Sequence, residues 1–289
     1  MNQSIAIVTD SLACLPPEIA REYNISIVPL SFMLNGRVYR DWIDISPSQA
    51  YELFLQDPDS FQSSAPSPDE FINVFRDLCN KYASILCITI SEKLSTTFNV
   101  ASLAAKQVMG ENPGSKIRVL DSMTTTAAEG FVALAAARAA ASGKSFDEVT
   151  NEAIKVRGKV QMLALLDTIR HVYRSGRIPK IASQVGAVLH VKPVLGILPE
   201  TSGLVHFSGI VRSRQQGIER LINAIKAYAG NTPIRIAIMH AYAPEEALNL
   251  KDRVQKTFNC LEIIMTEFSP LMGYATGTGT VGVAFYKES

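Results

Sequence analysis

The sequence predicts an α/β protein with an N-terminal doubly wound, mostly parallel sheet domain and a smaller C-terminal α/β domain. Short apolar runs of strand length alternate with helix-length segments through the first half, which is typical of a parallel sheet covered by helices on both faces. This alternation loosens after about residue 160. A length of 289 residues with 47% hydrophobic residues is sufficient for two cores. We therefore assign residues 1–160 to the first domain and 161–289 to the second.

The elements of the first half follow from residue types and from helix-start signals. Ser67 and Ser145 each precede a glutamate by three positions, as in a capping box, and predict helices that begin directly after them. Asn35-Gly36 predicts a hairpin turn between "ISIVPLSFML" and "RVYRD". The remaining strands are predicted at 4–9, 83–90 and 116–120, and the helices at 16–23, 67–82, 96–110, 124–143 and from 145 onward.

The second half contains apolar runs that are less regularly spaced. A long polar segment, "DTIRHVYRSGRIPK", separates its first two strands and leads into a short helix that ends at Ala187. The strands are predicted at 161–166, 192–200, 203–211, 234–241, 261–268 and 280–286, and two further helices at 213–229 and 244–258.

Composition and charge argue against several classes of protein. A net charge of +1 gives no reason to expect a nucleic-acid partner. No apolar stretch reaches 18 residues, and the N-terminus runs directly into a strand without a basic region, so we expect a cytoplasmic protein. The four cysteines are scattered with no C-x-x-C pair, which predicts neither a disulfide framework nor a zinc site. We expect no metal and no cofactor.

The segment "GYATGTGTVG" (273–282) contains the letters of the dinucleotide fingerprint G-x-G-x-x-G. That fingerprint requires a strand before it, a helix after it and an acidic residue about 20 positions further on. Here the run "TVGVAFY" that follows is a predicted strand, and only ten residues remain after Gly279. The context therefore excludes a nucleotide-binding loop.

Hydroxyl groups gather where the predicted strands of the first sheet end. Ligands of open α/β sheets bind beyond the carboxyl ends of the strands, so these side chains should line a common crevice. The crevice is predicted to be rich in hydroxyls and poor in charge. Its candidate members are Thr9, Asp10, Ser11, Ser63, Ser64, Ser91, Ser95, Thr96, Thr97, Asp121, Ser122, Thr124, Thr125 and Thr126.

Two other interpretations of these serines remain open at this point. A serine before a helix is most often an N-cap, which is our interpretation of Ser67 and an even alternative for Ser95. A serine-dependent acyl-ester hydrolase or acyltransferase is the second. Neither G-x-S-x-G nor S-x-x-K occurs, and all four histidines lie in the second half of the chain, none beside a serine cluster in sequence.

Six segments in order along the whole chain resemble the DegV family. "IVTDSLACLP" is similar to the family's opening T-D-S, "SSAPSPDEF" to its T-S-Q-P-S-x-x-E-F, and "ISEKLSTTFNVA" to its L-S-G-T-Y-x-S-A segment. "VLDSMTTTAAEG" resembles its D-S block, "RSGRIPKIASQVGAVLHVKPVLGI" its G-G-R-I segment, and "ATGTGTVGVAFY" its closing H-T-G-P-G-T-x-G. Each similarity is weak alone, whereas six in the same order are specific.

The resemblance implies a lipid-binding role. Members of the DegV family bind fatty acids, and the best understood are the fatty-acid-binding subunits of the bacterial fatty acid kinase system. By position, Ser95 corresponds to the family's carboxylate-binding serine, with the N–H of Thr96 beside it. Ser63 corresponds to a family threonine. Arg177 matches the arginine of G-G-R-I, near which a basic face is implied to meet the kinase; Arg212 is a looser candidate, and a helix cap or an ion pair is the alternative for Arg177.

The closing segment departs from the family pattern. The family's histidine, which completes the hydrogen bonds to the carboxylate, is replaced by Ala275, and Thr278 replaces its proline. Gly277 remains, so we interpret 273–282 as a glycine-rich lid in which Ala275, Thr276 and Gly277 lie over the ligand head group. The missing imidazole affects transfer to a kinase more than it affects lipid binding.

The combined expectation is a non-catalytic carrier, without cofactor, whose bound ligand is a long-chain fatty acid. The carrier would present the carboxylate to a separate fatty acid kinase, or would act without a kinase as a divergent lipid-binding protein. We expect a monomer that contacts membranes only transiently for lipid exchange. The alanine-rich helix at 127–141 is either a wall of the acyl tunnel or a helix packed closely against the sheet, and the second is favoured.

Overall fold

The computed structural model describes residues 5–64, 66–168, 170–175 and 191–288 of the chain. It confirms the α/β class and the alternation predicted for the first half. The first 160 residues contain strands β1 (Ile5–Asp10), β2 (Ile25–Val28), β3 (Ser31–Leu34), β4 (Arg37–Arg40), β5 (Gln62–Ser63), β6 (Ser84–Thr89) and β7 (Lys116–Asp121), and helices α1 (Pro17–Glu22), α2 (Pro47–Gln56), α3 (Pro68–Cys79), α4 (Thr97–Glu111), α5 (Thr126–Ala141) and α6 (Phe146–Arg157).

The first sheet has the strand order β2-β1-β6-β7, and every neighbouring pair is parallel. Alternate residues of its strands point to opposite faces, as strand geometry requires. Ala6 and Val8 of β1 pack against the core formed with α3 and α4, whereas Ile7 belongs to the core formed with α5. Helices therefore cover both faces of the sheet, which is the doubly wound arrangement predicted from the sequence.

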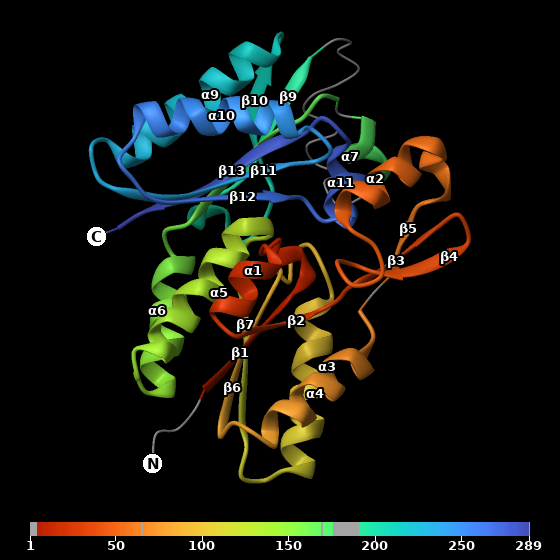
Figure 1. Ribbon diagram of the computed structural model, residues 1–289, viewed down its shortest axis with the longest axis vertical. Helices are drawn as coiled ribbons and strands as arrows, with labels where there is room; N and C mark the ends of the chain where they lie inside the picture. Colours follow the sequence, from red (N-terminus) through yellow and green to blue (C-terminus); the bar gives the residue numbers. More distant parts are fainter. Residues whose placement is uncertain (1–4, 65, 169, 176–190, 289) are drawn as a thin grey trace.

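The rest of the chain builds a second, six-stranded sheet with the order β10-β9-β8-β13-β11-β12. Its neighbouring strands are antiparallel except for the pair β11 and β12. Helices α9 and α10 cover its outer face, at the top of Figure 1. Its elements are β8 (Gln161–Leu165), α7 (Arg170–Ser175), β9 (Lys192–Ile197), β10 (His206–Val211), α9 (Arg214–Ala229), β11 (Ile234–His240), α10 (Pro244–Thr257), β12 (Cys260–Glu267), α11 (Pro270–Thr276) and β13 (Val281–Lys287). The short helix predicted to end at Ala187 lies outside the described residues.

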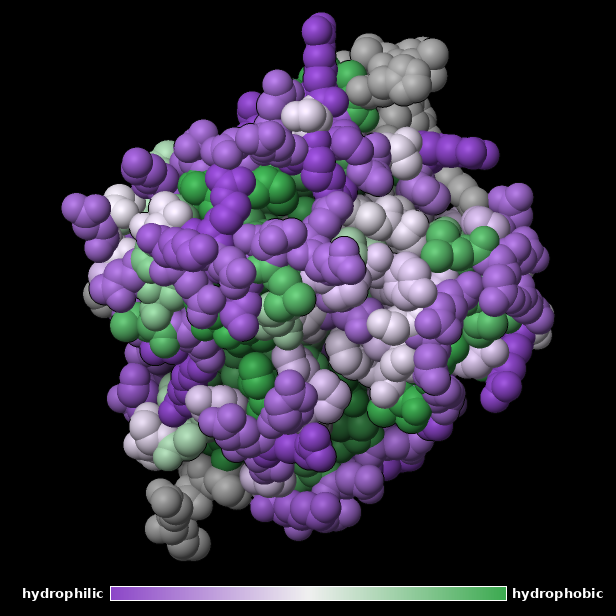
Figure 2. Space-filling model, turned by 45° about the horizontal axis from the view of Figure 1, so that its top comes forward, coloured by the Kyte–Doolittle hydropathy of each residue, from purple (hydrophilic) through white to green (hydrophobic). Residues whose placement is uncertain are grey.

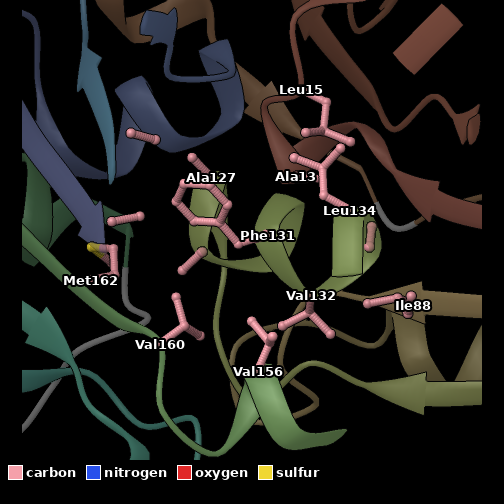
Figure 3. Close-up of a cluster of buried hydrophobic side chains, with 14 of the residues drawn as sticks. Ala13, Leu15, Ile88, Ala127, Phe131, Val132, Leu134, Val156, Val160 and Met162 are labelled. Carbon is pink, nitrogen blue, oxygen red and sulfur yellow. The ribbon is translucent and has the colours of Figure 1, made fainter. Parts of the chain in front are cut away.

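Helix α5 lies between the two sheets and joins their cores. Its small residues allow close approach on all sides, and Phe131 packs edge-on against Tyr286 of β13. Figure 3 shows Phe131, Val132 and Leu134 of this helix surrounded by side chains from both sheets, including Met162 of β8. The predicted domain boundary at residue 160 coincides with the start of β8. The two sheets share one core, so the division of the chain into two domains remains a prediction.

A third, small sheet and the three helices α2, α7 and α11 were not predicted. Strands β4, β3 and β5 form it, and the predicted Asn35-Gly36 hairpin is its β3–β4 turn. Helix α2 has a complete capping box between Ser46 and Gln49, a signal that is present in the sequence and that we overlooked. Helix α11 is short and contains Gly273, where a Cβ atom would lie 2.1 Å from the Tyr51 ring. Helix α11 nevertheless carries local signals that we overlooked, with Ser269 as its N-cap, Pro270 at its first position and Gly277 directly after its end.

Hydrophilic side chains cover most of the face seen in Figure 2, and hydrophobic ones appear there in separate, smaller patches. No helix within the described ranges is long and apolar enough to cross a membrane.

Candidate functional site

The candidate site lies where the strand order of the first sheet reverses. From β1 the chain moves to β2 on one side, and from β6 it moves to β7 on the other, so the carboxyl ends of the adjacent strands β1 and β6 face an open crevice. Such a point is the usual ligand site of a doubly wound sheet. The loops that begin at Ser11, Ser91 and Ser122 meet there, as the sequence predicted.

Asp10 ties two of these loops together. Its carboxylate accepts hydrogen bonds from the backbone N–H of Leu12 at 2.9 Å and from that of Ile90 at 2.9 Å. The second bond joins the end of β1 to the end of β6. The Ser91 hydroxyl extends the connection by donating to the carbonyl of Gly203, in the second half of the chain, at 3.0 Å. The crevice is therefore held in shape by buried hydrogen bonds that use no ligand.

Ser95 is positioned to donate a hydrogen bond into the crevice. Its Oγ accepts from the N–H of Thr97 at 3.3 Å and lies 2.7 Å from the hydroxyl oxygen of Thr97, which is fully buried. A serine hydroxyl has two acceptor sites and one hydrogen. When Thr97 donates both its backbone N–H and its hydroxyl hydrogen to Ser95 Oγ, the hydroxyl hydrogen of Ser95 remains available for another acceptor. The capping role and the ligand-binding role of Ser95 are thus compatible, although we had treated them as alternatives.

An apolar pocket opens beside Ser95. It encloses about 910 Å³ of atom-free space, part of it open to solvent. None of the described residues that line it carries a charge. The lining consists of Leu12, Leu30, Ser63, Ser64, Pro66, Ile90, Leu94, Ser95, Thr125, Met162, Ala164, Leu166, Leu195, Ile197, Val205, Leu271, Met272, Ala275 and Thr276.

One apolar wall of the pocket comes from the second sheet. Met162, Ala164 and Leu166 are spaced two residues apart along β8 and its end, so they share one face, and Leu195 and Ile197 of β9 extend it. The hydroxyls come from the first-sheet loops, from β5 and from α11. We did not predict that Ala164, Leu166, Leu195 and Ile197 line a pocket, because "QMLALL" is apolar on both faces of the strand and does not indicate which face meets a cavity.

The structure brings most of the predicted head-group residues to this pocket. Ser63, Ser95, Ala275 and Thr276 line it, whereas Thr96 and Gly277 are chain neighbours of lining residues and do not line it themselves. The Thr276 hydroxyl donates to the carbonyl of Met272 at 2.9 Å. Thr276 therefore contributes a satisfied hydroxyl to the wall.

The glycine-rich lid is shorter than we expected. Residues 270–276 form helix α11, and only the turn that follows is a loop, with positive φ angles of 89° at Gly277 and 84° at Gly279. His171 of α7 packs against this turn. A Cβ atom placed on Gly277 would lie only 2.5 Å from Cδ2 of the His171 ring. An imidazole therefore does lie near the closing segment, and sequence spacing could not indicate it. His171 does not line the pocket.

The helix at 127–141 is not a tunnel wall. The described pocket lining includes Thr125, which precedes α5, but no residue of the helix itself. Two methionines, Met162 and Met272, line the pocket instead. The close-packed interpretation of α5 is therefore correct.

Of the two candidate docking arginines, only Arg212 belongs to the described part of the chain. Arg177 lies outside the described residues. Arg212 is exposed at the end of β10, and its backbone N–H donates to the side chain of Gln216 at 3.0 Å.

Three carboxyl groups are buried behind the crevice. Burial raises the pKa of Asp10 to about 6 and that of Asp41 to about 7, and it raises the pKa of Glu129 well above its ordinary value. Asp41 accepts a hydrogen bond of 2.6 Å from the Ser269 hydroxyl, and Glu129 accepts one of 3.1 Å from Thr9. These groups do not line the pocket, so they shape its surroundings without putting charge into it.

The described lining of the pocket offers apolar carbon and hydroxyl groups but no acid–base group. A serine nucleophile needs an adjacent base, and no histidine, lysine or carboxylate is among the described lining residues. What the site provides is an apolar surface with a few hydroxyl groups. That combination matches a molecule with a long hydrocarbon part and a small polar group.

These features define an α/β protein with two sheets around a shared core and an apolar, hydroxyl-bearing pocket between them. Comparison with known proteins is more specific. The model of the DegV family, described as a family of uncharacterised proteins, matches residues 4–288. The chain belongs to the DegV family.

Relatives and solved structures agree with this assignment. A DegV domain-containing protein of Clostridium perfringens is 31% identical over 287 residues, which cover 99% of each chain. A DegV family protein from Thermus thermophilus, whose structure is described as showing fatty acid binding, is similar at a TM-score of 0.89, with 28% identity, and the match covers 99% of this chain and 100% of that one. DegV of Bacillus subtilis, described as a fatty acid binding protein, has a TM-score of 0.89, 26% identity and the same coverage.

Proposed function

We propose that this protein binds a long-chain fatty acid without transforming it. The acyl chain occupies the apolar pocket between the two sheets, and the carboxylate lies beside Ser95. The observation that carries the proposal is the pocket lining, which is apolar with hydroxyl groups and contains no charge among the described residues. The fatty acid binding described for the Thermus thermophilus and Bacillus subtilis proteins supports it.

The head group is held by hydrogen bonds from neutral donors in this proposal. Ser95 donates its hydroxyl hydrogen, and Ser63 contributes a second hydroxyl from β5. The N–H of Thr96 lies at the start of α4, where the first N–H groups of a helix have no partner within the helix and attract anions. Ala275, Thr276 and Gly277 close over the head group from the end of α11.

Burial of the tail dominates the energetics. Each methylene transferred from water contributes about 0.8 kcal/mol, so a chain of sixteen to eighteen carbons contributes on the order of 12 kcal/mol before the costs of association. A hydrogen bond to a charged acceptor contributes roughly 1.5–3 kcal/mol. Replacing the family histidine by Ala275 therefore leaves most of the affinity intact.

We further propose that the protein is a soluble cytoplasmic monomer that presents the bound carboxylate to a separate fatty acid kinase. Arg212 supports a docking role because it is exposed and belongs to the loop between β10 and α9. Arg177 is the companion candidate from the sequence resemblance. Exchange of lipid would require only transient contact with a membrane.

Organic-solvent extraction of the purified protein followed by mass spectrometry tests the proposal. We expect free fatty acid close to one equivalent per chain, which reloading with a defined fatty acid restores after delipidation. Protein that neither carries nor takes up fatty acid would contradict the proposal. Turnover of acyl esters that Ser95→Ala abolishes would establish a hydrolase or acyltransferase in place of a carrier.

A further inference from the structure

Helix α11 forms part of the pocket wall although it is very short. It has seven residues, too few for its own backbone hydrogen bonds to keep it folded in water. Figure 1 shows it beside α2, between the second sheet and the small sheet β4-β3-β5. Its place at the pocket therefore depends on contacts with the rest of the molecule. The residues that it contributes to the lining are Leu271, Met272, Ala275 and Thr276.

The N-terminus of α11 is attached to Asp41 through a serine. Ser269 is the N-cap of the helix, and its Oγ accepts from the N–H of Leu271 at 3.2 Å. The same hydroxyl donates to Asp41 Oδ2 at 2.6 Å. Asp41 follows β4, and its own N–H donates to the carbonyl of Leu30, another lining residue, at 2.8 Å. One residue thus joins two parts of the pocket wall that are far apart in the sequence.

The surroundings of Asp41 disfavour a charged carboxylate. Only 1% of the residue is exposed, and burial raises the pKa of its carboxyl group to about 7 against the opposing effect of the Ser269 hydrogen bond. The titratable groups that face it in the described part of the chain are Asp10, the Cys14 thiol and Tyr51, none of which can carry a positive charge. An ionised Asp41 is therefore left without a counter-ion among these neighbours.

Ionisation of Asp41 favours a conformation in which its carboxylate meets water. A hydroxyl donor binds a charged acceptor more strongly than a neutral one, but a single such bond does not replace the hydration that a buried carboxylate has lost. Water that reaches Asp41 Oδ2 competes with the Ser269 hydroxyl for that oxygen. Because Ser269 is the cap of α11, this competition weakens the attachment of the helix.

We propose that Asp41 is a positioning residue for the fatty-acid pocket, which through Ser269 holds α11 in place as a pocket wall while its carboxyl group is neutral and loosens that wall when the group ionises. This role rests on the proposed function, because it concerns the pocket in which the fatty acid is held. Asp41 does not itself line the pocket. The fatty acid should consequently leave the protein more slowly at pH 5 than at pH 7.5.

The variant Asp41→Asn separates the charge from the contact, because an amide oxygen can accept the Ser269 hydrogen bond but cannot ionise. Release of a fluorescent long-chain fatty acid to excess phosphatidylcholine vesicles is measured for both proteins at pH 5 and pH 7.5. The ionisation of the fatty acid, of Asp10 and of Glu129 is common to both and cancels in the ratio of their rates. We expect the ratio, unmodified protein over variant, to rise roughly tenfold or more, since a raised pKa shifts such an equilibrium by up to tenfold per pH unit.

Hydrogen exchange of the ligand-free protein measures the same role without a fatty acid. Amides of residues 270–277 should exchange faster in the unmodified protein than in Asp41→Asn, by a ratio that is larger at pH 7.5 than at pH 5. Helix α6, at residues 146–157, is the internal control and should show little difference. An equal increase in both segments would show a loss of global stability and overturn the positioning role.

The variant Ser269→Ala removes the contact itself. It should speed release at both pH values, and adding Asp41→Asn to it should then change little, because coupled residues are not additive. Ser145→Ala is the matched control, since it removes the equivalent cap of α6 and should leave release unchanged.

The outcomes separate this role from the proposed function. A ratio of release rates that does not change with pH would overturn the role of Asp41 and leave fatty acid binding intact, as would a full effect of Asp41→Asn in the Ser269→Ala background. A protein that takes up no fatty acid at either pH would contradict the proposed function, and hydrogen exchange of α11 would still decide whether Asp41 positions the helix.

Discussion

Ser95 illustrates how one side chain can serve the fold and a ligand together. Its oxygen accepts from the N–H of Thr97 at the start of α4, which satisfies a helix N-terminus. Its hydrogen is available to the pocket when the Thr97 hydroxyl is the donor of the bond between the two hydroxyl groups. Sequence position was sufficient to place such hydroxyls at the carboxyl ends of the strands. It was not sufficient for His171, because the contact of His171 with Gly277 depends on how α7 packs against α11, about a hundred positions further along the chain.

Replacing Ser95 should weaken fatty acid binding without abolishing it. Ser95→Ala removes one hydrogen bond to a carboxylate, so we expect a loss of about 1.5–3 kcal/mol, or roughly a 10- to 100-fold higher Kd. Displacement of a fluorescent fatty acid measures this change.

Ser67→Ala is the matched control, because Ser67 caps α3 and does not line the pocket. It should lower stability by about 1 kcal/mol and leave the Kd unchanged. An unchanged Kd for Ser95→Ala would show that Ser95 acts only as a cap.

Asp41 should make stability depend on pH. Its pKa is raised by burial from 3.8 to about 7, so the folded protein retains a proton that the unfolded chain loses. The contribution of Asp41 to the free energy of unfolding is fully present below pH 4. It decreases by roughly 3–4 kcal/mol as the pH rises to about 7. Urea unfolding of the unmodified protein and of Asp41→Asn at several pH values isolates the contribution. A difference between the two that does not change from pH 4 to 7 would contradict this assignment.

At the scale of single elements, β8 connects the core to the pocket. Its alternate residues face α9 on one side and the pocket on the other, so Leu163 and Leu165 belong to one core while Met162 and Ala164 lie at the cavity. The run "QMLALL" predicted the strand correctly but not the use of its two faces. That depends on which sheet lies opposite, and sequence periodicity carries no information about it.

Enlarging Ala164 should shorten the fatty acid that the pocket accepts. Ala164→Phe places a ring in the apolar part of the cavity, so octadecanoic acid should bind roughly tenfold more weakly or worse, while decanoic acid loses much less. Calorimetry with a series of chain lengths measures the shift. The short acids serve as an internal control for folding, and a uniform loss across the series would show that Ala164 does not contact the tail.

At the scale of the whole molecule, the fold could be predicted well where the sequence is locally consistent. The parallel first sheet, the hairpin at Asn35-Gly36 and the principal helices all followed from periodicity and caps. Two of the missed helices carry start signals that we overlooked, a capping box at Ser46 for α2 and the Ser269 cap followed by Pro270 for α11. The third, α7, lies in a polar segment that we did not predict to be helical. The antiparallel pairing of the second sheet depends on long-range contacts that no local signal specifies.

The shared core has a consequence for ligand binding. Because α5 packs against both sheets and the pocket is lined from both, a ligand in the pocket touches each half of the molecule. Its binding should therefore stabilise the protein as one unit, shifting a single unfolding transition to higher temperature.

A crystal structure of the purified protein with octadecanoic acid tests the central claim most directly. We predict a tail enclosed between β8, β9 and α11, with a carboxylate oxygen within hydrogen-bond distance of Ser95 Oγ. A fatty acid bound elsewhere, or a carboxylate turned away from Ser95 toward solvent, would contradict the account.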